Sequence, residues 1–204
     1  MSVSSNTLRL VSIASPVLLV VIWQACASGG LIDTRFFPAP WAVAQEGWLM
    51  VKSGEIWTHT GISVVRILVG FLLGAVPGVI IGLAMGLSPL VRAIMQPLIS
   101  ATFPIPKVAI LPLFILMFGL GEMSKYAVIA ISVIYLVIIN TYEGVRGINR
   151  IYMDVGKNFG ATRWMMFKDV ALPGALPNIL AGMRMALAVA LLIIVAAEFV
   201  GAKA

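Results

Sequence analysis

Long uncharged stretches alternate with short polar or proline-rich segments along the chain. Uncharged runs cover residues 10–27, 67–87 and 126–142, and shorter apolar runs cover residues 108–121 and 185–197. The run at 67–87 would extend about 31 Å as an α-helix, enough to cross the hydrocarbon core of a bilayer. The pattern therefore predicts an all-α membrane protein with about five transmembrane helices, organised as a single transmembrane domain over residues 1–204.

The segments between the predicted spans differ from one another in character. Residues 28–60 contain the turn "FFPAP", and residues 41–52 can form a short helix at the membrane surface. This region carries three tryptophans that suit a membrane–water interface, with stacking on a ligand as the alternative: Trp41, Trp48 and Trp57. Residues 88–107 hold four prolines, which predict short helical pieces and turns rather than a span. Residues 119–125 are predicted to form a tight turn into the fourth span.

Glycine recurs every fourth residue in the second predicted span. The series is Gly70, Gly74, Gly78, Gly82 and Gly86. Small residues at this spacing form one stripe on a helix and let a second helix approach closely, which is how helices associate in lipid. We predict that the stripe packs against another helix of the same chain; a dimer seam or a pore wall is the alternative. Pro77 lies inside this helix and is predicted to kink it.

Composition and charge placement support a membrane location. Charged residues make up 11% of the chain, against about 25% in soluble domains. If the N-terminus is cytoplasmic, most of the 14 lysines and arginines lie on the cytoplasmic side, close to span ends. The net charge of +6 is therefore a topology signal, and we predict no nucleic-acid partner.

The first predicted span has two interpretations. Arg9, the apolar run and the small residues at 25–27 also fit a cleaved signal peptide. The length of the run, and Trp23 near its end as an interface anchor, favour a retained membrane helix.

A polar and aromatic segment at residues 143–182 is much longer than a connection between neighbouring spans requires. Ile151, Val155 and Phe159 recur on one helical face, and Gly160 can end that helix in a left-handed conformation. Thr162 can cap a second helix over residues 163–170 that displays Trp164, Met165 and Phe167. The Leu-Pro pairs at 172–173 and 176–177 are predicted to break regular structure before the last span. The amphipathic pair could lie in the headgroup layer, but its aromatic cluster better fits a groove of a cytoplasmic protein.

The spacing in this segment resembles the cytoplasmic signature of permease subunits of bacterial ABC importers. That signature reads Glu-Ala-Ala, three residues, Gly, nine residues, then Ile-x-Leu-Pro. Here Asp154-Val155-Gly156 precedes Gly160 at the same offset, and Val170-Ala171-Leu172-Pro173 follows, with substitutions mainly in the first triplet. Stretches such as "FFPAP", "VRILVGFLLGAVPGVIIGLAMGLSP" and "GATRWMMFKDVALPGALPNILAGMR" resemble the nitrate, sulfonate, taurine and bicarbonate branch, over residues 36–201. Members of that family usually have a sixth span, whereas this sequence stops at Ala204.

The resemblance implies a function and partners. Two permease copies would form the solute path across the bacterial inner membrane, a separate ATPase subunit would use ATP and Mg, and a periplasmic or lipid-anchored binding protein would deliver a small anion. The chain itself would bind no cofactor, and it has no Walker sequence for binding nucleotide. The residues that the resemblance assigns to ATPase coupling are Asp154, Gly156, Gly160, Ala161, Thr162, Arg163, Trp164, Phe167, Val170, Leu172 and Pro173.

Few residues suggest other chemistry. Glu198, near the end of the fifth span, is either a pathway residue or an acid that reaches interfacial water. Arg184 is interpreted as an anchor that extends to the interface, and Glu122 with Lys125 as an exposed turn pair. His59 has no ligand partners at metal-binding spacing, so no metal site and no catalytic residues are predicted. An ion-gradient-driven transporter or a membrane scaffold remains the alternative function.

Overall fold

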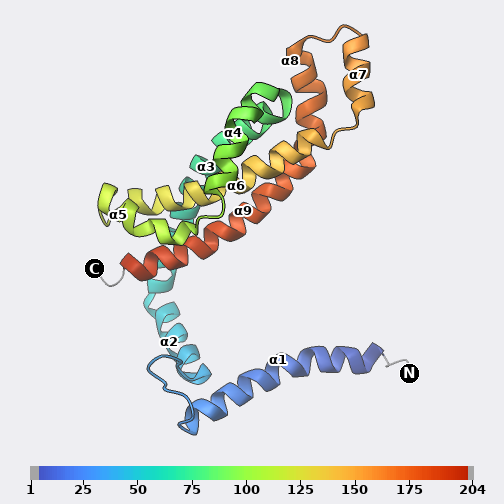
Figure 1. Cartoon of the computed structure of the whole chain (residues 1–204). Coiled ribbons are helices and arrows are strands. Elements are labelled where there is room, and N and C mark those ends of the chain that lie inside the picture. The colour runs from blue at the N-terminus through green and yellow to red at the C-terminus, as the bar shows by residue number, and fades with distance from the viewer. Residues whose placement is uncertain (1–4, 202–204) are drawn as a thin grey trace. The chain divides into compact units, whose positions relative to one another are not determined.

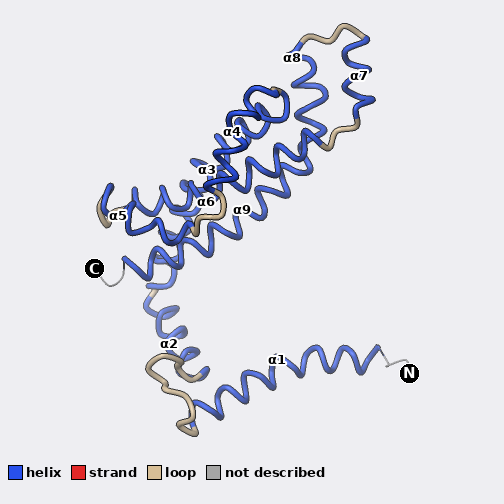
Figure 2. Tube along the Cα trace, in the orientation of Figure 1, coloured by secondary structure: helices blue, strands red, loops and turns tan. Residues whose placement is uncertain are grey.

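A computed structural model describes residues 5–201, and throughout that range the chain is helical, without a strand (Figure 1). The predicted all-α fold is therefore confirmed. Loops and turns are short, as the tube in Figure 2 makes clear. Contacts divide the chain into two units, residues 1–61 and residues 62–204.

The first unit contains α1 (Ser5–Ser28) and α2 (Pro40–Ser53), and the second of these is the predicted surface helix. The side chain of Gln24 in α1 accepts a hydrogen bond from the backbone N–H of Trp41 at 3.0 Å. Gly54 ends α2 in the left-handed conformation, with φ of 79°. In the loop between them, Arg35 donates hydrogen bonds to Asp33 and lowers the pKa of that carboxyl group. The predicted interfacial tryptophans, including Trp41, are exposed.

Three long helices form the core of the second unit: α3 (Glu55–Leu87, counted here from residue 62), α6 (Glu122–Arg146) and α9 (Leu172–Gly201). α6 is central, since its Ile129, Val133 and Val137 have no exposed surface. α9 runs beside α6 along most of its length (Figure 1) and presents small residues such as Ala186 to it. Long apolar side chains on the outward faces of α3 and α9 remain exposed, as expected of helices that contact lipid.

The glycine stripe of α3 lies against α6. A Cβ built on Gly82 would lie 2.6 Å from Thr141 Cβ, and one on Gly78 would lie 2.9 Å from Val137 Cβ. The same offset of 59 residues relates Gly70 to Ile129 and Gly86 to Val145, so the two helices run parallel in a constant register. Only glycine permits this approach, and dispersion between the backbones then stabilises the pair.

Two further glycines bring α6 and α9 together, and the sequence analysis did not identify them. A Cβ on Gly144 of α6 would lie 2.8 Å from Asn178 Cβ, and one on Gly182 of α9 would lie 2.6 Å from Asn140 Cβ. The two helices are antiparallel at this contact. No four-residue repeat marks these glycines, so the sequence alone gave no signal for them.

The proline-rich region forms a short helix and a turn, as predicted. α4 (Pro89–Thr102) is one helix that contains Pro97, and it is followed by η1 (Lys107–Ile110) and α5 (Leu111–Phe118). The predicted third span at 108–121 does not stand alone: η1 and α5 end at Phe118 and lie at 85° to α4, and the two parts together form a broken span or a re-entrant loop.

Lys107 satisfies the carbonyl groups at this bend. Its ammonium donates to the carbonyl oxygens of Thr102, Phe103 and Ile105 at 2.8, 3.0 and 2.8 Å. It also lies 4.4 Å from the centre of the Tyr135 ring. All three ammonium donors are used, so the lysine closes the carboxyl end of α4.

Within the described residues, four helices are long and apolar enough to cross a membrane, and the number is five if the bent pair counts as one span. That agrees with the predicted number. Pro77 lies inside α3, which continues past it as a single helix. Prolines are tolerated in membrane helices because neighbouring groups satisfy the freed carbonyls.

Candidate functional site

A helical hairpin follows α6 at one end of the second unit (Figure 1). Its first arm is α7 (Arg150–Asn158), an amphipathic helix as predicted. Gly160 has φ of 72°, and the N–H of Ala161 donates to the carbonyl of Gly156 at 2.9 Å. These two features form the Schellman motif that ends a helix at a glycine. The predicted left-handed stop at Gly160 is therefore confirmed.

The second arm begins with α8 (Arg163–Met165). The hydroxyl of Thr162 accepts a hydrogen bond from the N–H of Met165 at 3.3 Å, which is the predicted N-cap. The sequence pattern thus identified both ends of the turn correctly, because capping depends on residues next to one another in the chain.

The predicted break at the Leu-Pro pairs is wrong. The segment η2 (Met166–Ala171), a π-helix, joins α8 directly to α9, and a continuous helix of 38 residues runs from Arg163 to Val200. A proline ring normally clashes with the carbonyl four residues earlier, which for Pro173 belongs to Asp169. Here the helix is widened at that point, and the N–H of Leu172 donates to Phe167, five residues back. The wider turn accommodates the proline without ending the helix. Pro177 likewise lies within α9.

The hairpin carries an exposed apolar surface, called here the α7–α8 surface: Ile151, Tyr152, Phe159, Trp164 and Met165. Phe159 at the turn is 87% exposed. The Trp164 ring stacks on the Phe167 ring with centres 5.3 Å apart. So large an apolar surface on a short hairpin is typical of a binding site for another molecule.

Phe167 is not displayed in the way the sequence suggested. It is half-buried and packs against a cluster that includes Leu83 of α3 and Val145 of α6. Leu172 packs on the same cluster. Phe167 therefore connects the exposed Trp164 to the core of the bundle.

A groove of about 470 Å³ lies between the arms of the hairpin, lined by Tyr152, Gly156, Asp169, Val170 and Pro173 among others. Gly156 replaces an alanine of the signature, and the Met166 side chain packs directly on its Cα. Asp154 and Arg163 lie at exposed positions on the two arms, and Ala161 is half-buried at the turn. Of the residues that the sequence grouped from 154 to 173, Gly156, Val170 and Pro173 line this groove, whereas Phe167 and Leu172 pack on the core cluster.

A second group of polar side chains, called here the ionic cluster, joins α3, α6 and α9 near the far end of α9 from the hairpin: Ser63, Arg66, Glu122, Lys125 and Glu198. Arg66 Nε donates to Glu122 Oε2 at 2.5 Å, and its Nη2 donates to Glu122 Oε1. Arg66 Nη1 donates to Glu198 Oε1 at 3.0 Å, and Ser63 Oγ donates to the same oxygen at 2.6 Å. Lys125 Nζ lies 3.6 Å from Glu122 Oε1.

No local pattern in the sequence indicates the ionic cluster. The predicted pair of Glu122 and Lys125 is present, but Glu122 also pairs with Arg66, whose side chain is only 16% exposed. Glu198, a candidate pathway residue, accepts hydrogen bonds from two residues of α3. The partners are 56 and 132 residues away from Arg66, so no local pattern could reveal them.

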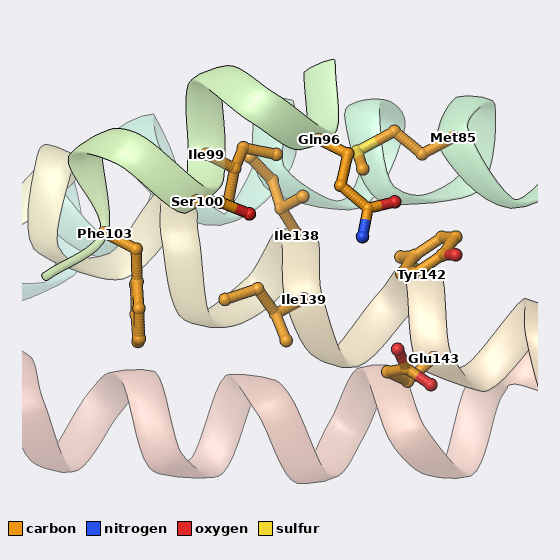
Figure 3. Close-up of a pocket in the computed structure, with 9 residues that line it drawn as sticks. All are labelled: Met85, Gln96, Ile99, Ser100, Phe103, Ile138, Ile139, Tyr142 and Glu143. Carbon is orange, nitrogen blue, oxygen red and sulfur yellow. The ribbon is translucent and has the colours of Figure 1, made fainter. Parts of the chain in front are cut away.

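A cavity of about 150 Å³ lies where α3, α4 and α6 meet (Figure 3). In Figure 3 the amide of Gln96 of α4 points toward the Tyr142 ring of α6, and Ser100 and Glu143 also belong to the lining, between apolar side chains. Its lining contains one carboxylate, Glu143, and no lysine or arginine. An anion would find no counter-charge among these lining residues, so the cavity is a poor site for an anionic solute.

Comparison with known proteins gives a consistent result. Residues 78–204 match the family described as the binding-protein-dependent transport system inner membrane component. The chain is 37% identical over 188 residues to SsuC of Escherichia coli, named an aliphatic sulfonates transport permease protein, covering 92% of this chain and 72% of SsuC. It is 34% identical over 198 residues to the taurine transport system permease protein TauC of the same organism, covering 94% and 71%. The riboflavin transport system permease protein RibX of Chloroflexus aurantiacus is 35% identical over 186 residues, covering 91% and 69%.

Proposed function

Since this chain belongs to the family of inner-membrane components of binding-protein-dependent transport systems, we propose that it imports a small sulfonate, with the α7–α8 surface as the contact for a separate ATPase. The protein is a multi-pass permease subunit of an ABC importer of the sulfonate and taurine branch. Which solute it carries, and which residues couple it to ATP hydrolysis, are the finer points of the proposal.

The observation that carries the coupling assignment is the shape of the hairpin. The Gly160 turn and the Thr162 cap connect the short helix α7 to the beginning of the 38-residue helix, where Trp164 is exposed. An exposed aromatic side chain in the first turn of a helix is well suited to a groove in another protein. Phe167 links this contact to the core, so that a displacement of the hairpin is passed to the long helices.

Similarity to SsuC and TauC supports a sulfonate or taurine as the solute. Nitrate and bicarbonate are the other small anions that the sequence resemblance implies. RibX has a similar identity, so riboflavin is the second candidate.

The remaining partners follow from the family. We place the N-terminus and the hairpin in the cytoplasm, with the ATPase using ATP and Mg there. A solute-binding protein, periplasmic or lipid-anchored, would contact the opposite side, and a second copy of the permease would complete the path within the lipid bilayer. This chain would contribute neither nucleotide binding nor a cofactor.

The test is reconstitution of the full chain with the proteins that copurify from its native membrane. Uptake of taurine, ethanesulfonate, nitrate, bicarbonate and riboflavin into proteoliposomes would be measured with and without ATP. We expect ATP-dependent uptake of taurine or ethanesulfonate that is lost when the ATPase is omitted. Uptake driven by an ion gradient without ATP would refute the function.

A matched pair of variants tests the coupling surface. Trp164→Ala and Trp41→Ala remove tryptophans of nearly equal exposure, 67% and 66%. We expect the Trp164 variant to weaken ATPase binding by about tenfold or more, since a truncated interface anchor typically costs about 2 kcal/mol, and the Trp41 variant to bind normally. Equal binding of the ATPase by both variants would disprove the assignment.

A further inference from the structure

The ionic cluster and the α7–α8 surface lie near opposite ends of one continuous helix. The helix from Arg163 to Val200 has 38 residues and is therefore about 57 Å long. Trp164 is its second residue, and Glu198 lies within its last turn. The π-helical turn at 166–171 and Pro177 are points at which this helix can bend, but α9 packs along α6. A displacement at the hairpin therefore reaches the Glu198 end through the packed helices.

At the Glu198 end, a single guanidinium ties this helix to two others. Arg66 of α3 forms a two-point contact with Glu122 of α6 and a third hydrogen bond with Glu198. Planar, charge-assisted contacts of this kind are directional, and they fix the relative position of the helices that carry the two carboxylates.

The cluster is also shielded from water more than an ordinary surface ion pair. The side chains of Arg66 and Lys125 are 16% and 14% exposed. With Glu122 and Glu198 they form a group of two positive and two negative charges. Removal of Arg66 would take away the cation that Glu122 and Glu198 share and leave Lys125 as the remaining cation, so the arrangement would not persist.

From this geometry we propose that Arg66 is a positioning residue for transport. It holds the ends of α3, α6 and α9 together so that a movement imposed at the α7–α8 surface turns the three helices as one body. Without Arg66, the Glu198 end of α9 would move independently of α3 and α6. ATP hydrolysis would then no longer be coupled to solute transport. This proposal depends on one part of the proposed function, namely that the α7–α8 surface contacts the ATPase.

The first experiment measures the end of the bundle directly. Spin labels are placed at Met123 on α6 and Phe199 on α9, both exposed, in a Cys26→Ser background. Labelled chain is diluted with unlabelled chain in the reconstituted complex. We expect one narrow label-to-label distance, the same with and without ATP. With Arg66→Ala we expect a broad distribution that depends on ATP. An ATP-dependent distance with Arg66 present, or an unchanged narrow one without it, overturns the proposal.

The second experiment measures coupling as taurine or ethanesulfonate imported per ATP hydrolysed. We expect Arg66→Ala to lower this ratio at least about fivefold, the lower limit typical of coupling between distant sites. ATPase binding should be unchanged. Arg66→Lys keeps the positive charge and should recover part of the ratio. The recovery should be incomplete, because one ammonium cannot make the two-point contact with Glu122 and also reach Glu198.

Arg35→Ala is the matched control, because it removes an arginine that pairs with a carboxylate, Asp33, only two residues away. Glu198→Gln is a milder second variant that keeps an acceptor for Ser63 and should lower the ratio less than Arg66→Ala. Equal ratios in the Arg35 and Arg66 variants would overturn the proposal. If Trp164→Ala leaves ATPase binding intact, the coupling surface is wrong, and this result is separate from the behaviour of Arg66.

Discussion

Replacement of one glycine of the stripe by alanine is the sharpest test of how α3 packs on α6. In Gly82→Ala the new Cβ would lie 2.6 Å from Thr141 Cβ and 2.8 Å from the Ile138 carbonyl oxygen. Ordinary carbon contacts lie at about 3.5–4.0 Å, so α3 and α6 would have to separate by about 1 Å. Overpacking of this kind costs about 1–3 kcal/mol.

Gly61→Ala is the control, because Gly61 lies in the same helix and no described atom is within 4 Å of its added Cβ. Alanine has a higher helix propensity than glycine, so Gly61→Ala should stabilise the chain by up to about 1 kcal/mol. Thermal unfolding in detergent would be followed for both variants. For a chain of this size 1 kcal/mol shifts the midpoint by about 2–4 °C, so Gly82→Ala should lower it by about 2–12 °C. Equal midpoints for the two variants would show that α3 does not pack on α6 through this stripe.

Three further predictions concern the core and the hairpin. Thr141 Oγ1 is buried without a hydrogen-bond partner in the described part of the chain. Thr141→Val should raise the midpoint of thermal unfolding, since a buried unsatisfied hydroxyl costs about 1–3 kcal/mol. A lower midpoint would show that the hydroxyl has a hydrogen-bond partner. Gly160→Val should weaken ATPase binding, because a β-branched residue at a positive φ is strained by about 1–2 kcal/mol. Gly160→Asn should retain binding, because asparagine tolerates that conformation. Similar losses in both variants would show that Gly160 contacts the ATPase directly. Phe167→Ala should destabilise the chain by about 2 kcal/mol, roughly half the loss for a fully buried Phe. Trp164→Ala should leave the unfolding midpoint nearly unchanged. If Trp164→Ala destabilised the chain more than Phe167→Ala, Phe167 would not be part of the core.

The sequence predicted those features that depend on neighbouring residues. The Gly160 stop, the Thr162 cap and the surface helix at 40–53 follow from local backbone chemistry, and all three are present. The spacing of glycines in α3 also indicated a packing face, because four residues return nearly to the same side of a helix.

The features that the sequence could not predict depend on contacts between distant segments. The ionic cluster joins residues of three helices, and Arg66 has no sequence neighbour that hints at Glu198. Continuity of the helix through Pro173 depends on the π-helical turn before it, which no residue type specifies. The 85° bend after α4 likewise required Lys107 to cap carbonyls that the proline-rich sequence leaves open.

The most direct test of the account is to identify the molecule that touches Trp164 in the native membrane. A photo-crosslinking amino acid would replace Trp164 in the full chain, and the crosslinked product would be identified by mass spectrometry. We expect a crosslink to a separate polypeptide that carries a nucleotide-binding sequence, and we expect it to disappear when that subunit is deleted. Crosslinks to lipid alone, unchanged by the deletion, would contradict the account.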